Sequence, residues 1–143
     1  MKRMTAFLLA GALTGGLASI AFAQTTTPGA ATGGTGGSAA VGGTSASTLG
    51  VGAASGDSSS IGVGGSAAGG TQQKTNRNVS GGGNSGNLNA HVNAKAQDGG
   101  TWSKSKTHTK VHKGEVRSRT KSMAHEPGGP PVKSTTGIDT GKQ

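Results

Sequence analysis

The sequence has no cysteine, no tyrosine and a single tryptophan, and both of its phenylalanines lie within the first 22 residues. The lack of cysteine excludes disulfide bonds, which stabilise many small exported proteins, and it excludes thiolate metal ligands. Large aliphatic side chains are also scarce, because only 12 of the 120 residues after position 23 are Leu, Ile or Val. Chains this poor in large apolar residues rarely bury a core. We therefore expect a mostly intrinsically disordered, low-complexity chain rich in Gly, Ser, Thr and Ala.

Acidic residues are scarce as well. The chain contains 5 Asp and Glu against 14 Lys and Arg, which gives a formal net charge of +9. The charge is unevenly distributed: Asp57 is the sole charged residue of 24–73, whereas 74–143 holds 12 Lys and Arg against four acidic residues. This asymmetry predicts a neutral Gly/Ser/Ala/Thr-rich linker (24–73) that precedes a basic effector region.

The first 23 residues resemble a secretory signal peptide. Lys2 and Arg3 precede an apolar run, and Ala21-Phe22-Ala23 supplies small residues at the positions that signal peptidase requires. We expect a helix within residues 4–22, cleavage after Ala23, and a periplasmic or extracellular protein. The alternative is an uncut membrane anchor, although the glycines in this run make it weakly apolar for that purpose. No later apolar stretch is long enough to form a transmembrane helix after cleavage.

The linker contains imperfect repeats. Gly36-Gly37-Ser38-Ala39-Ala40 returns from Gly64, and Leu49-Gly50-Val51-Gly52 returns from Ile61. A stacked solenoid or a matrix-forming element is one interpretation, but two copies are fewer than the three that a stacked array needs. We therefore expect 24–73 to be coil.

Two later segments alternate polar and apolar residues. In 74–101, an Asn/Gly-rich segment, residues 88–97 place apolar side chains at every even position, which predicts a strand, although Ala, Lys and Gln also favour a helix. In the basic segment 102–122, a turn at Lys113-Gly114 would bring the two halves into phase as a β-hairpin. This hairpin would pair Val111 with Val116 and Lys106 with Lys121, and would collect hydroxyl groups on one face and cations on the other.

Opposed cations disfavour this hairpin, because like charges directly across a strand pair repel one another. A two-stranded hairpin is also marginal by itself. We therefore expect at most marginal strand or hairpin structure in 87–122, formed when a polyanion removes the repulsion, with a shapeless basic run as the alternative. The Pro- and Gly-containing tail, 123–143, is expected to be disordered coil.

No motif indicates an enzyme, so no catalytic residue is assigned. There is no nucleophile elbow, no close carboxylate pair and no phosphate-binding loop. The four histidines are the remaining candidate metal ligands, but the lysines near His108 and His112 would repel a cation, so neither a metal site nor a cofactor is predicted. At mildly acid pH these imidazoles would add positive charge.

The best-supported hypothesis is a polycation that binds anionic polymers. Lipopolysaccharide, acidic polysaccharide and nucleic acid all fit, because contact with a charged backbone is independent of its sequence. No defined oligomer is expected, and the alternative is a glycine-rich structural or self-assembling surface protein. The predicted binding residues are the cations of the basic segment: Lys104, Lys106, Lys110, Lys113, Arg117, Arg119 and Lys121.

Overall fold

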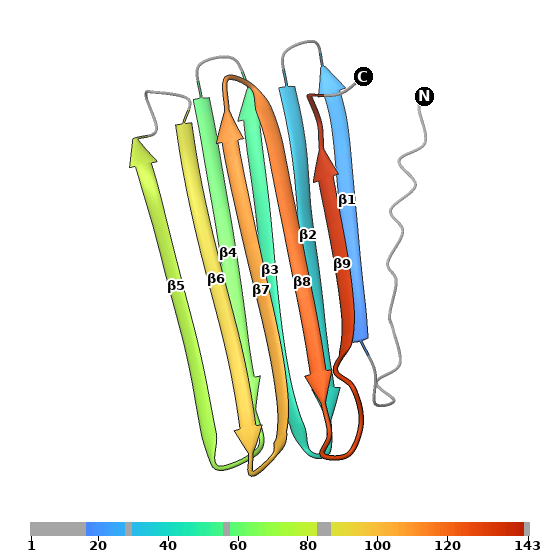
Figure 1. The fold of residues 1–143 in the computed structure, drawn as a ribbon. Coiled ribbons are helices and arrows are strands. Elements are labelled where there is room, and N and C mark those ends of the chain that lie inside the picture. The colour runs from blue at the N-terminus through green and yellow to red at the C-terminus, as the bar shows by residue number, and fades with distance from the viewer. Residues whose placement is uncertain (1–16, 28–29, 56–57, 83–86, 142–143) are drawn as a thin grey trace, which may run out of the picture.

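A computed structural model describes residues 17–27, 30–55, 58–82 and 87–141, which form two antiparallel sheets (Figure 1). The four-stranded sheet contains β1 (Leu17–Thr27), β2 (Ala30–Val41), β3 (Thr44–Ser55) and β4 (Ser58–Ala68). The five-stranded sheet contains β5 (Gln72–Gly82), β6 (Asn87–Asp98), β7 (Thr101–His112), β8 (Glu115–His125) and β9 (Val132–Asp139). Each sheet is a simple meander in which every strand pairs with the next along the chain.

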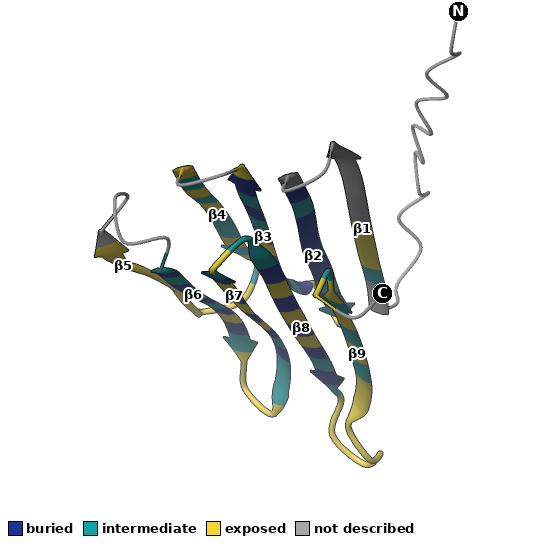
Figure 2. Ribbon diagram, turned by 90° about the horizontal axis from the view of Figure 1, so that it is seen from above, coloured by how far each residue is buried: buried dark blue, intermediate teal, exposed yellow. Residues whose placement is uncertain are grey.

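The two sheets lie face to face as a sandwich. β2 packs against β8, β3 against β7, β4 against β6, and β1 against β9 (Figure 1). Figure 2 shows buried residues alternating with intermediate or exposed ones along β3 and β8, as expected for strands with one face in a core. The link from β4 to β5 crosses between the sheets, and β5 lies exposed at the edge beside β6.

Glycine lets the sheets approach each other. Gly50 and Gly52 of β3 face the interior, where side chains of the opposite sheet fill the space above them. A Cβ atom on Gly52 would lie 2.8 Å from methyl carbons of both Val111 and Val116, closer than real Cβ contacts allow. The core is therefore built by inserting the side chains of β7 and β8 over bare backbone on β3.

Hydroxyl groups make up much of this core. Thr48 Oγ1 lies 2.6 Å from Ser105 Oγ and 2.7 Å from Thr107 Oγ1, and Thr35 Oγ1 makes equivalent hydrogen bonds to Ser118 and Thr120 at 2.7 and 2.8 Å. All six of these side chains are buried. Buried polar groups are tolerated when they are hydrogen-bonded, and here the bonds join the two sheets directly.

An apolar cluster adds to this network at one end of the sandwich. Its members are Ala31, Ala54, Leu88, Val111 and Val116, with Ile61 packed against them.

The prediction of a mostly disordered, low-complexity chain is therefore wrong. The linker 24–73 contributes β2, β3 and β4, and the tail 123–143 contributes the end of β8 and all of β9. Counting large aliphatics underestimated the core, because the interior of this sandwich is filled by alanine, threonine, serine and valine. The repeats are not a solenoid: their copies lie on β2, β3 and β4 of one meander sheet.

The expected signal helix over 4–22 is contradicted where it can be compared. Residues 17–22 belong to β1 and pair with β2, and residues 4–16 lie outside the described part of the chain. Cleavage after Ala23 stays a prediction. Within the described ranges no helix has the length and apolar character needed to cross a membrane.

The alternation in 88–97 does form a strand. It is the central part of β6, and Leu88, Ala90, Val92, Ala94 and Ala96 are all buried. The basic segment forms the β7–β8 hairpin in the register derived from the sequence, with Val111 opposite Val116 and Lys106 opposite Lys121.

The expectation that this hairpin would be marginal and need a polyanion is wrong for two reasons. β7 is paired on both sides, with β6 as well as β8. The hydroxyl-bearing face of the hairpin is covered by β2 and β3. Burial of this face offsets the repulsion between the exposed cations.

Candidate functional site: a basic sheet face

The outer side of the five-stranded sheet carries most of the cations of the protein. Side chains alternate between the two sides of a strand, so the hydroxyls of β7 and β8 face the core while their basic residues face outward. We call this surface the basic face. Its described cations are Lys74, Lys95, Lys104, Lys106, Lys110, Arg117, Arg119, Lys121 and Lys133.

Strand registers place these cations side by side. Lys74, Lys95 and Lys104 are directly opposite one another on β5, β6 and β7, and Lys106 is opposite Lys121. Neighbouring strands lie about 4.8 Å apart, and residues on one face repeat about every 6.8 Å along a strand. The result is a two-dimensional array of positive charge on one side of the molecule.

Crowding has a direct electrostatic effect on Lys104. Partial burial lowers the pKa of this ammonium group from 10.5, and the neighbouring charges of Lys106 and Lys95 lower it further. Each of these causes disfavours the protonated form. The array is therefore under electrostatic strain that a negatively charged ligand would relieve.

Carboxylates lie at one end of the basic face. Arg117 forms ion pairs with Glu115 at 3.2 Å and with Asp139 at 3.0 Å. Nearby, the His112 ring donates a hydrogen bond through Nδ1 to the side-chain oxygen of Asn87. Arg117 is thus held by protein carboxylates and is less available to a ligand than the other cations.

Aromatic rings occupy the middle and the opposite end. His91 and His108 face each other across β6 and β7 with ring centroids 5.7 Å apart. Trp102 and His125 make a similar contact, at 5.5 Å, across β7 and β8. The rings of Trp102 and His125 therefore border the cation array at the end away from Glu115.

A shallow hollow of about 610 Å³ lies on the basic face near β9. Its lining includes three basic side chains, His108, Lys110 and Arg119, and also Asp139. It exists partly because Gly137 has no side chain where the row formed by His91, His108 and Arg119 reaches β9.

Six of the seven predicted binding residues lie on this face. Lys113 is the exception, because it occupies the turn between β7 and β8, with φ of 48°. Sequence reasoning missed Lys74, Lys95 and Lys133. Lys95 could have been found, since it occupies a polar position of the alternating segment 88–97, whereas the strands that carry Lys74 and Lys133 gave no signal.

The described residues contain no cluster of three His, Asp or Glu side chains that could hold a metal ion. Comparisons of the chain with protein-family models, curated proteins and solved structures found no match. Function must therefore be argued from the charge and geometry of the basic face.

Proposed function

We propose that this protein is exported and binds anionic polymers, without catalysis, through the basic face. The observation that carries the proposal is the array of opposed cations on a single rigid sheet. Among the described residues, Arg117 is the one cation of the array with a carboxylate within ion-pair distance. The repulsion within the array costs stability, and a polyanion laid across it would remove that cost.

The shape of the face favours a polymer over a small molecule. A five-stranded sheet offers an extended surface with cations on all of its strands, and its hollow is shallow and open. Such a surface suits repeated phosphate, sulfate or carboxylate groups along a chain or on a membrane. Lipopolysaccharide, acidic polysaccharide and nucleic acid all present such repeats, and release of their counterions supplies the binding free energy.

The test is a pair of variants of the full chain that lose cations from different places. One variant replaces Lys104, Lys106, Arg119 and Lys121 by glutamine. The control replaces Arg77 and Lys113, which lie outside the basic face. We expect the parent protein to bind duplex DNA and a sulfated polysaccharide, with a slope of log K against log salt near −5 on DNA if about six phosphates are contacted.

The face variant should lose most of this affinity and flatten the slope, because each neutralised phosphate contributes about −0.9 to it. The control should keep a slope close to that of the parent. A loss that follows the number of cations removed, wherever they lie, would contradict a defined binding face.

The alternative of a self-assembling matrix protein relied on the repeats in 36–71 and on the segment 88–97 as stacking units. In the structure this segment is β6, which is paired with β5 on one side and β7 on the other. No free edge remains for stacking at this strand, whereas β4, which carries a copy of the repeats, lies at an edge of its sheet. The matrix hypothesis stays an alternative.

A further inference from the structure

The outer face of the four-stranded sheet is chemically the opposite of the basic face. The described residues of β1 to β4 include no Lys, Arg, Asp or Glu. Three large apolar side chains are exposed there, Ile20 at 52%, Leu49 at 41% and Phe22 at 40%. We call this surface the neutral face. Exposed apolar groups gathered on one uncharged surface usually mark an interaction site.

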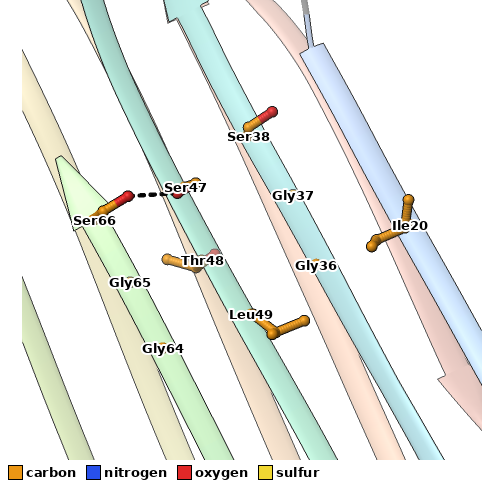
Figure 3. A pocket seen from close by; sticks show the side chains of 10 residues that line it. All are labelled: Ile20, Gly36, Gly37, Ser38, Ser47, Thr48, Leu49, Gly64, Gly65 and Ser66. Carbon is orange, nitrogen blue, oxygen red and sulfur yellow. Dashed lines mark hydrogen bonds between the residues drawn. The ribbon is translucent and has the colours of Figure 1, made fainter. Parts of the chain in front are cut away.

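The neutral face has a raised side and a lowered side. On the raised side, Ile20 and Leu49 lean over Gly36, with carbons 3.2 Å from the position of a Cβ (Figure 3). The Phe22 ring covers Gly34. On the lowered side, Gly62 and Gly64 of β4 have open space above their backbone. A shallow hollow of about 350 Å³ extends from Ile20 to Gly64 past Leu49.

We propose that a second copy of the uncleaved chain, which keeps residues 17–23, packs on the neutral face to form a twofold-symmetric dimer. A rotation of 180° about an axis parallel to the strands places β1 of one copy over β4 of the other. The raised side of each copy then fills the lowered side of its partner, which is the self-complementarity that a twofold interface requires. A twofold axis in the plane of the interface but perpendicular to the strands would instead place β1 over β1. The raised sides of the two copies would then face each other.

The size of the face is adequate for such a dimer. Four strands at about 4.8 Å spacing, each about 12 residues long at about 3.3 Å per residue, cover about 19 by 40 Å. Two copies would bury about 1,500 Å² in total, within the range of about 1,200–2,000 Å² seen for stable interfaces.

Charge favours the same arrangement. The interface would bury no ionised side chain of the described residues, so it avoids the desolvation cost of buried charge. It would also leave the two basic faces on opposite outer sides, at the greatest distance from each other. A copy packed on the basic face would instead bring two cation arrays together.

Sedimentation velocity of the full chain tests this proposal, with Gly62→Val/Gly64→Val as the main variant. A Cβ at either glycine meets nothing within 4 Å in the single copy, and valine favours strands, so the fold should be kept or stabilised. The added methyl groups fill the lowered side. We expect the parent protein to be a dimer and this variant to dissociate at least about tenfold more readily.

Gly137→Val is the matched control, because it places the same side chain on the outer side of the other sheet, at an ordinary 3.5 Å contact with the Ser118 oxygen. It should remain a dimer. A parent protein that is monomeric at concentrations on the order of 100 µM, or a double valine variant that dimerises as well as the parent, would overturn the proposal. The measurement is made without polyanion, so its outcome does not depend on the function of the basic face.

Discussion

Buried hydroxyls hold the two sheets together at positions where most sandwiches use aliphatic side chains. Thr48 bridges Ser105 and Thr107 of the opposite sheet, and each of these partners has a further hydrogen bond of its own. A net contribution of about 1 kcal/mol per hydrogen bond is typical. Several such bonds between the sheets amount to a substantial part of the stability of a small domain.

Thr48→Val tests this contribution, because valine keeps the shape of threonine and removes the hydroxyl. We expect the free energy of unfolding to fall by about 1–3 kcal/mol, since two hydrogen bonds are lost and the site stays polar. Urea denaturation measures the change. Thr135→Val, on an exposed position of β9, should change it by less than about 0.5 kcal/mol. A Thr48 variant as stable as the parent would show that the hydroxyls contribute only their volume.

At the scale of elements, the turn between β7 and β8 is the least favourable part of a well-paired hairpin. Lys113 has φ of 48° and Gly114 has φ of 82°, which is the pattern of a type I′ turn. Glycine tolerates this backbone region, but lysine is disfavoured in it. The hairpin therefore forms despite its turn sequence, through pairing on both sides of β7 and burial of its inner face.

Lys113→Asn should stabilise the protein by up to about 1 kcal/mol, because asparagine tolerates the left-handed region and Asn-Gly is the preferred type I′ sequence. Thermal or urea unfolding measures the effect. Lys113→Gln separates the two contributions, since it removes the same charge without tolerating the left-handed region. If the glutamine variant is stabilised equally, loss of charge rather than turn geometry is the cause.

Sequence alternation located the strands in which polar and apolar residues contrast, and failed where they do not. β6, β7 and β8 alternate alanine, valine or hydroxyls with amides and cations, so both their positions and the β7–β8 register followed from the sequence. In β3 and β4 the contrast is between glycine and small residues. Leu49 and Val51 face outward from β3, whereas Ile61, in the matching repeat on β4, faces the core.

The same limit applied to the candidate site. Six of its cations could be identified because they lie in one alternating segment. The remaining three come from β5, β6 and β9, and only assembly of the sheet brings them beside the others. A charge count on one segment cannot find residues that become neighbours through pairing of distant strands.

Considered as a whole, the molecule gathers cations on the outer side of one sheet, whereas the described strands of the other sheet carry no Lys, Arg, Asp or Glu. The crowding of the cations has a consequence for the response of the protein to pH. Burial and neighbouring cations lower the pKa of Lys104 in the folded state from 10.5. The unfolded chain then binds more protons at this site than the folded one, so the free energy of unfolding rises as pH increases through the interval below 10.5.

Lys104→Met should make this rise shallower, and it should stabilise the protein at neutral pH by removing a charge from a crowded row. Urea denaturation at a series of alkaline pH values measures both effects. Lys133→Met removes one charge from β9 and is the control. If the Lys104 variant shows the same dependence on pH as the parent, other groups govern the alkaline behaviour.

Strand β1 has two incompatible uses. Residues 17–23 are part of the apolar leader predicted from the sequence, and they also pair with β2 from Gly33 to Ala39. If signal peptidase cuts after Ala23, the exported chain loses Ile20 and Phe22, and the backbone of β2 loses its neighbour along this stretch. An unpaired strand edge recruits another strand. Maturation would thus move the edge of the four-stranded sheet from β1 to β2, and would leave the Gly-rich β2 able to accept a foreign strand only after transport.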